Sequence, residues 1–168
     1  MFFPVAVKKF VVLSIFTFGV YQFYWFYKNW RLVRERERTD ISPFWRTFFA
    51  YFFCYALFKR VRDQQHLAPN SKPFSAGALA IGWIVLNLLW DIPVPWVLVC
   101  LGAVFFTVPV QAAAIQINAA VAPHHDRNET LSAVNWLGIV LGALFVILVL
   151  VAAMVLPELF TATGSIEI

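Results

Sequence analysis

Four side chains able to bind a metal ion lie close together in one polar stretch of the sequence, PHHDRNET. They are His124, His125, Asp126 and Glu129. His125 and Glu129 are four residues apart, so a helical turn would direct both toward one ion, and Asp126 could supply a third ligand. The spacing matches no specific zinc signature, and adjacent histidines point apart. The alternative is a polar connection that ends one helix and caps the next. We favour this alternative and predict neither a bound metal nor another cofactor.

Three uncharged amides, Gln111, Gln116 and Asn118, follow a proline in an otherwise apolar, alanine-rich stretch. In a membrane, such side chains can line a polar path, although hydrogen bonding between helices is their commoner use. A path would suit a small transporter or channel component. One chain has too few helices for a conventional transporter, so that hypothesis requires an oligomer.

Small residues at helical spacing predict sites where helices pack closely. Gly138 and Gly142 form a GxxxG pair, and Asn135 lies at the right spacing to join the same stripe. Ala78 and Gly82 form a second pair of small residues. Such stripes let the backbones of two helices approach, either within one chain or between two copies.

Basic and aromatic residues are both frequent over positions 24–72, and we call seven of the basic residues the collar. The collar consists of Lys28, Arg31, Arg34, Arg46, Lys59, Arg60 and Arg62. A basic residue near an anionic bilayer contributes about 1 kcal/mol, and aromatic rings at headgroup level fix the depth of a helix. Arg46 lies at the edge of an apolar run, where it can anchor to lipid phosphates or serve transport or catalysis. We expect the collar to contact anionic headgroups or a membrane protein partner.

The composition requires a membrane around these residues. Of the 168 residues, 61% are hydrophobic and only 13% are charged, whereas about 25% are charged in a typical soluble domain. The apolar surplus must face lipid, and a single membrane domain over residues 1–168 accounts for the length. The net charge of +4 indicates anionic lipid as a partner rather than nucleic acid, because no soluble basic domain is present.

Five helical segments follow from the apolar runs and the residues that interrupt them. They are residues 10–38, 43–62, 73–90, 96–122 and 131–156. The apolar and aromatic part of the first segment, residues 10–30, would extend about 31 Å as one helix, enough to cross a bilayer core of about 30 Å. We expect Pro109 to kink the fourth segment and Pro157 to end the fifth.

The second segment is too short for an ordinary crossing. Ser42 and Pro43 give it a capping side chain and a proline in its first turn, both typical of a helix start. Between Arg46 and Lys59 it has 12 uncharged residues, about 18 Å of helix. Its charged ends could snorkel to recover part of the deficit, so length alone leaves a thin crossing open.

Counting Lys and Arg decides between the topologies, because these residues gather on the cytoplasmic side. If residues 43–62 cross, the two sides carry seven and six; if they do not, the sides carry eleven and two. We therefore predict an all-α integral membrane protein with about four transmembrane helices plus one short aromatic interfacial or re-entrant helix. Its C-terminus would lie outside. A third topology, in which residues 10–30 also return, would place all thirteen inside, but the length of that stretch argues for a crossing. The side of the N-terminus is left open.

Residues 21–61, YQFYWFYKNWRLVRERERTDISPFWRTFFAYFFCYALFKRV, carry a resemblance to a known group. An aromatic YWFYKNW element, a basic linker, an SPFWR start and an LFKR end resemble the front half of small uncharacterised bacterial multi-pass membrane proteins. The later pieces AIQINAAVAP and NETLSAVN are similar to the second half of that group. The resemblance implies a location in the bacterial cytoplasmic membrane and no particular activity.

Three functional hypotheses follow. The leading one is a non-enzymatic membrane accessory or scaffold protein whose collar contacts anionic lipid or a partner. The second is an oligomeric transporter or channel component that uses the polar path. The third is a membrane-embedded, metal-dependent enzyme acting on lipid through residues 124–129.

Overall fold

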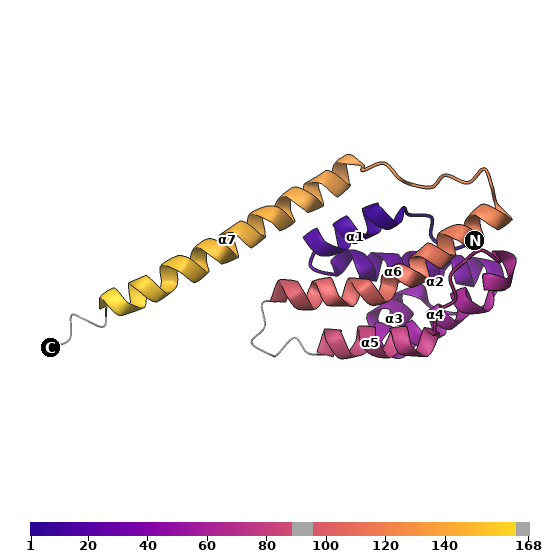
Figure 1. Ribbon diagram of the computed structural model, residues 1–168, viewed down its shortest axis with the longest axis horizontal. Coiled ribbons are helices and arrows are strands. Elements are labelled where there is room, and N and C mark those ends of the chain that lie inside the picture. Colours follow the sequence, from indigo (N-terminus) through magenta and orange to yellow (C-terminus); the bar gives the residue numbers. More distant parts are fainter. Residues whose placement is uncertain (89–95, 164–168) are drawn as a thin grey trace.

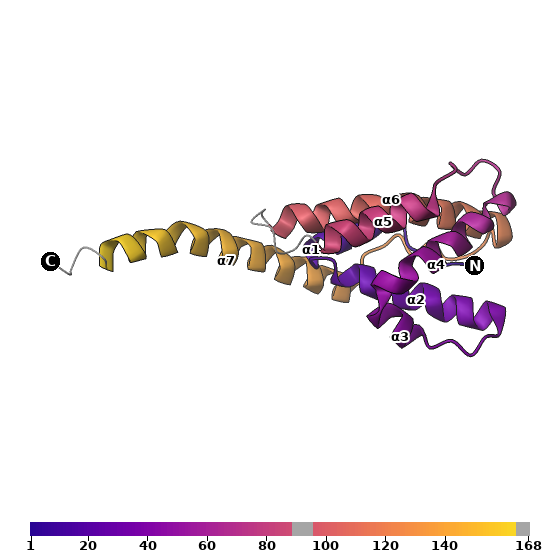
Figure 2. The ribbon, with the colours of Figure 1, turned by 90° about the horizontal axis from the view of Figure 1, so that it is seen from below.

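The protein is built from helices (Figure 1), and the computed structural model describes residues 1–88 and 96–163. The helices are α1 (Val7–Phe16), α2 (Val20–Glu37), α3 (Pro43–Phe48), α4 (Ala50–Asp63), α5 (Ala76–Leu88), α6 (Trp96–Val121) and α7 (Ala133–Thr163), with a 3-10 turn at Gln65–Leu67. No strand occurs within these ranges, which confirms the all-α prediction. Helices α1 to α6 pack together, whereas most of α7 extends away from them (Figure 2).

The first predicted segment, residues 10–38, is two helices and not one, so that prediction was wrong. Phe18 and Gly19 have φ of 51° and 84°, in the left-handed region that ends a right-handed helix. The Gly19 N–H donates to Ser14 O at 2.8 Å and the Phe18 N–H to Ile15 O at 3.1 Å. This pair of bonds is the Schellman motif, which satisfies the last carbonyl groups of α1. The Thr17 hydroxyl then accepts from the Tyr21 N–H at 2.9 Å, so it also caps the start of α2.

After this turn, α2 runs back alongside α1, so that its second half lies beside the first residues of the chain. The Phe3 N–H donates to Asn29 Oδ1 at 3.0 Å, although the two residues are 26 positions apart. One straight helix would separate them by about 39 Å. The guanidinium of Arg36 also lies 4.9 Å from the centre of the Phe2 ring. Residues 1–37 therefore form a hairpin with both ends on the same side.

Buried amide side chains hold residues 1–6 in an irregular, extended path against α6. Asn118 accepts from the Phe2 N–H at 2.7 Å and donates to Phe2 O at 2.8 Å, as a neighbouring β-strand would. Gln111 donates to Val5 O at 2.7 Å and accepts from the Trp25 indole at 2.6 Å. Asn118, Gln111, Phe2 and Val5 are fully buried. Because water cannot reach these groups, each depends on its partner in the protein.

The second predicted segment, residues 43–62, is also interrupted. Ser42 accepts from the Trp45 N–H at 3.4 Å with Pro43 in the first turn, which confirms the predicted start. The helix breaks at Phe49, whose φ of −95° and ψ of 42° are not helical. Arg46 before the break and Arg60 after it lie 4.5 and 5.4 Å from the centre of the same Trp30 ring. Both ends of this segment therefore meet α2 at one level.

Helices α5 and α6 form a close pair. A Cβ atom added to Gly82 would overlap the ring of Phe106, and one added to Gly102 would lie 2.6 Å from Leu86 Cδ1. Helix α6 continues through Pro109. The predicted end of the third segment at residue 90 lies outside the described residues.

Helix α7 extends further than predicted and packs on α1 alone among the described helices. Its predicted end at Pro157 was wrong, because the helix continues to Thr163. A proline removes one intrahelical hydrogen bond, and helices in a membrane tolerate this loss where other groups or a local adjustment of the helix satisfy the freed carbonyl. Exposed apolar residues occur on several faces of α7, including Trp136, Leu141 and Phe145.

One stretch of the described chain, Gly102–Val121 in α6, is long and apolar enough to cross a membrane. Two further apolar stretches, Ala76–Leu88 and Ala133–Leu148, are shorter. Length and composition thus agree with a membrane location for at least one helix.

Replacing Asn118 by Leu tests the support of residues 1–6. The change keeps the size of the side chain but leaves the Phe2 N–H and C=O without partners, at a cost of about 1–3 kcal/mol for each buried group. We expect a clear fall in the thermal unfolding temperature of the detergent-purified protein. The control is Gln116→Leu on the same helix, where the side chain is exposed. Equal shifts in the two variants would contradict the assigned role of Asn118.

Replacing Gly142 by Ala tests the contact between α7 and α1. The added methyl group would overlap the carbonyl oxygen of Phe16, and such overpacking costs about 1–3 kcal/mol. Gly138→Ala is the matched control, since its methyl group would meet Thr17 Cγ2 at an ordinary 3.7 Å. Thermal unfolding should separate the two variants. If Gly142→Ala is tolerated as well as Gly138→Ala, the close approach is wrong.

Candidate functional site

Two collar arginines lie over one buried indole ring. Arg46 Cζ is 4.5 Å from the centre of the Trp30 ring and 5.2 Å from that of Phe53, and Arg60 Cζ is 5.4 Å from Trp30. Trp30 is fully buried, and its Nε1 has no hydrogen-bond partner among the described residues. Cations over aromatic faces are attracted by the negative charge of the ring faces. The indole therefore holds two positive charges at the same level of the fold.

Glu37 partly neutralises this pair. Its carboxylate accepts from Arg60 Nε at 3.0 Å and from Arg36 Nη2 at 3.4 Å. Burial alone would raise the pKa of Glu37, but the hydrogen bonds and charges of Arg60 and Arg36 outweigh it and lower the pKa. Glu37 is thus held in its charged form. Arg46 has no ion pair within the described part of the chain.

The remaining collar residues divide into paired and unpaired groups. Arg31 pairs with Glu35 at 3.2 Å, and Arg62 pairs with Asp63 at 2.8 Å. Arg34 and Lys59 are exposed and form no ion pair with the described residues. The collar therefore carries less free positive charge than its residue count indicates.

Exposed aromatic side chains cover α3 and the start of α4, and we call them the aromatic ridge. The ridge consists of Phe44, Trp45, Phe48, Phe49 and Phe52, whose side chains are 43–79% exposed. Neighbouring rings contact one another, for example Trp45 and Phe49, stacked at 5.9 Å. Arg46 lies within this run and is directed instead at Trp30. The short segment thus presents aromatic rings outward and a guanidinium inward.

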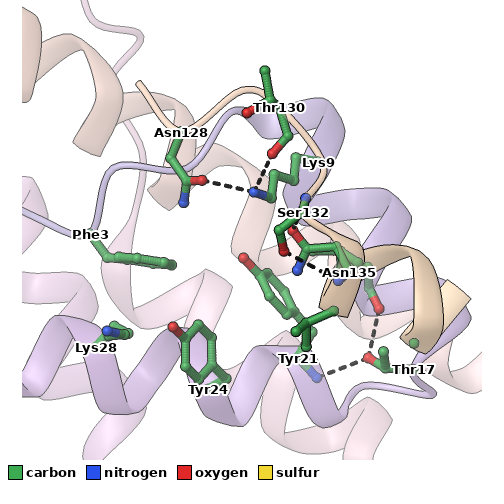
Figure 3. Close-up of a pocket in the computed structure, with 13 residues that line it drawn as sticks. Phe3, Lys9, Thr17, Tyr21, Tyr24, Lys28, Asn128, Thr130, Ser132 and Asn135 are labelled. Atoms are coloured by element: carbon green, nitrogen blue, oxygen red, sulfur yellow. Dashed lines mark hydrogen bonds between the residues drawn. The ribbon is translucent and has the colours of Figure 1, made fainter. Parts of the chain in front are cut away.

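The collar residue Lys28 lines a cavity of about 680 Å³ between α1, α2 and the start of α7 (Figure 3). Its Nζ is 5.4 Å from the centre of the Tyr24 ring and 5.9 Å from that of Phe3. Neither an ion pair nor a hydrogen bond to the described residues satisfies this ammonium group. Tyr21 and Tyr24 line the same cavity.

A second lysine lines this cavity and was not among the residues predicted from the sequence. Lys9 is only 7% exposed, and its Nζ donates to Asn128 Oδ1 at 2.8 Å and to Thr130 O at 2.7 Å (Figure 3). Burial lowers the pKa of Lys9, and the nearby charge of Asp126 partly offsets this. Lys9 and Asn128 are 119 positions apart, so no local pattern indicates the contact. The one signal is a basic pair, Lys8 and Lys9, directly before an apolar run.

The three amides proposed for a polar path do not act together. Gln111 and Asn118 are buried and bonded to residues 1–6, whereas Gln116 is exposed. Hydrogen bonding within the protein, the alternative considered above, accounts for the first two. The structure therefore gives the path no continuous lining.

Only some residues of the predicted small-residue stripes lie at close helix contacts. Gly82 and Gly142 lie at close helix contacts, but Ala78 is exposed. Asn135 forms a reciprocal cap with Ser132, in which its Oδ1 accepts from the Ser132 N–H at 3.1 Å and Ser132 Oγ accepts from the Asn135 N–H at 3.4 Å. Ser132 and Asn135 thus cap the first turn of α7.

The histidine loop forms a connection before α7. His125 Nδ1 lies 2.6 Å from Ala122 O, Asp126 accepts from the Asn128 N–H at 2.8 Å, and Glu129 lies 4.0 Å from Arg127. Within the described residues, no three His, Cys, Asp or Glu side chains, His124 included, come close enough to hold a metal ion. The geometry gives no support to the metal-site hypothesis.

Comparison of the chain with protein-family models, curated proteins and solved structures finds no match.

Proposed function

We propose that this protein is a non-enzymatic accessory or scaffold protein of the membrane, whose basic end lies among anionic lipid headgroups. The observation that carries the proposal is the stacking of Arg46 and Arg60 on Trp30 beside the exposed aromatic ridge. Aromatic rings are favoured at the level of the headgroups, and guanidinium groups there can reach lipid phosphates. The short segment thus combines a depth anchor with positive charge.

Two hairpins, residues 1–37 and the interrupted segment of residues 43–63, support a revised topology. The Arg36 guanidinium lies over the Phe2 ring, and Arg60 pairs with Glu37, so both hairpins end at the same level, beside the last turn of α2. If this level is the cytoplasmic surface, residues 1–63 enter the membrane and return without crossing it. Helices α5, α6 and α7 then cross, and the C-terminus lies outside. All thirteen Lys and Arg are then on the cytoplasmic side, which is the strongest bias this chain can have.

The resemblance and the basic residues support a location in the bacterial cytoplasmic membrane. The resemblance of residues 21–61 to bacterial multi-pass proteins implies the cytoplasmic membrane. The leaflet facing the cytoplasm is anionic, and each basic residue near it contributes about 1 kcal/mol. The carboxylates of Glu35, Glu37 and Asp63 reduce this sum by pairing with three collar arginines.

The transporter hypothesis receives less support. It requires a polar path, and two of the three amides assigned to that path are bonded to residues 1–6. An accessory role requires only a fixed orientation in the membrane and an accessible basic surface. A membrane protein partner or a second copy would meet the exposed apolar faces of α7 within the bilayer.

Cysteine labelling tests the topology. In a background with Cys54 and Cys100 replaced by Ala, Lys8→Cys and Lys59→Cys should both react with a membrane-impermeant maleimide from the cytoplasmic side, because the hairpins return. Ser165→Cys is the control for the opposite side. Labelling of Lys8→Cys from the side that labels Ser165→Cys would show that residues 10–38 cross.

Lipid analysis tests the collar. The full-length protein is extracted from membranes in a polymer-bounded lipid disc, and the phosphatidylglycerol fraction around it is measured at low and high salt. Arg34→Gln should lower the enrichment up to about five-fold, as expected for about 1 kcal/mol. Its neighbour Glu35→Gln removes a negative charge and should keep or raise the enrichment. A lipid fraction that neither variant changes would overturn the proposal.

A further inference from the structure

We propose that the cavity between α1, α2 and the start of α7 binds the phosphate group of an anionic amphiphile, with Lys28 and Lys9 as its cationic partners. The proposal concerns one stoichiometric site with a defined lining. It is distinct from the general attraction between the collar and the bilayer.

The cavity is rich in hydrogen-bond donors that the protein leaves unused. The Lys28 ammonium group carries three donors and has neither an ion pair nor a hydrogen bond to the described residues. Lys9 uses two of its three donors for Asn128 Oδ1 and Thr130 O, so one is free for a ligand. The hydroxyl groups of Tyr21 and Tyr24 point into the open space between the two lysines (Figure 3).

The cavity offers no carboxylate to neutralise these donors. Its lining includes two lysines and neither Asp nor Glu. Asp126, the acidic group whose charge reaches Lys9, is not part of the lining and accepts a hydrogen bond from the Asn128 backbone. An anion in the cavity would therefore meet two ammonium groups and no carboxylate in the lining. A phosphate group suits the site because its oxygens accept several hydrogen bonds at once.

The lining of the cavity is partly apolar, which indicates an amphiphile. Phe3, Leu13 and Val134 belong to it together with the polar groups. The volume of about 680 Å³ lies within the range of about 300–1,000 Å³ usual for small-molecule sites. A phosphate group with a glycerol unit and the first part of an acyl chain matches a lining of both kinds.

The same phosphate chemistry could come from a membrane phospholipid or from a soluble phosphate ester. The inference rests on the proposed function only in requiring a protein at the membrane surface. The collar residue Arg34 does not line the cavity, and the cavity residue Lys28 lies apart from the collar stack on Trp30. Variants can therefore test the two proposals separately.

Native mass spectrometry of the full-length protein in a neutral detergent tests the inference. Phosphatidylglycerol, phosphatidylcholine and glycerol 3-phosphate are titrated separately, and glycerol 3-phosphate is then added to the complex with phosphatidylglycerol. We expect one saturable phosphatidylglycerol and weaker binding of phosphatidylcholine. Lys28→Gln should weaken phosphatidylglycerol binding roughly ten-fold, because one charge-assisted hydrogen bond is lost.

Each variant of a cavity residue has a matched control outside the cavity: Lys59→Gln for Lys28→Gln, and Tyr27→Phe for Tyr24→Phe. Lys59→Gln removes an exposed charge outside the cavity, and Tyr27→Phe removes a hydroxyl group that does not line it. Tyr24→Phe should weaken binding, whereas both controls should bind as the wild type does. Thermal unfolding of each variant shows whether it is folded. The conservative changes at residues 24 and 28 keep the test valid even if Lys9 variants fail to fold.

Each result decides a point. Saturable lipid binding that glycerol 3-phosphate does not displace supports a phospholipid site, and displacement by that ester supports a site for soluble phosphates. No saturable binding of either compound, or equal loss with Lys28→Gln and Lys59→Gln, overturns the inference. If Arg34→Gln leaves the phosphatidylglycerol enrichment in the lipid disc unchanged while Lys28→Gln still weakens saturable phosphatidylglycerol binding, the proposed function is refuted. The cavity site is then still supported.

Discussion

The arrangement of the whole chain depends on polar backbone groups that are buried without water. Residues 1–6 form no helix, so their N–H and C=O groups require partners from elsewhere. Asn118 supplies both partners of Phe2, Gln111 binds Val5, and Asn29 accepts from Phe3. These bonds join the start of the chain to the middle of α2 and to the last turns of α6. Losing one of them would leave a buried polar group unsatisfied, at a cost of about 1–3 kcal/mol.

This constraint explains why the first two apolar segments turn back. Because Phe3 is bonded to Asn29, the chain between them must turn, and Phe18 and Gly19 provide the turn in left-handed conformations. The second hairpin returns to α2 in the same way, through the Trp30 stack and the Arg60–Glu37 pair. The basic groups therefore gather at one end. The aromatic ridge lies beside Arg46 and gives that end an apolar anchor.

The two proposed lipid contacts differ in their physical character. The collar is exposed and partly neutralised by its own carboxylates, so its attraction to a bilayer is diffuse and sensitive to salt. The cavity holds two lysines without a carboxylate in its lining. A ligand there would meet a fixed set of donors supplied by α1, α2 and the loop before α7. One protein could thus combine general attachment with a single selective site.

The sequence by itself determined the helical class, the apolar character and the cap at Ser42 and Pro43, because these follow from composition and local chemistry. It also indicated that residues 43–62 are too short for an ordinary crossing. Only the tertiary structure revealed the turn at Phe18 and Gly19, the buried contacts of Asn118 and the cavity around Lys9. These features join residues up to 119 positions apart, and helical periodicity carries no information about such pairs. An apolar run of about 31 Å fits a straight crossing and a bent hairpin equally well, and long-range hydrogen bonds decided between them.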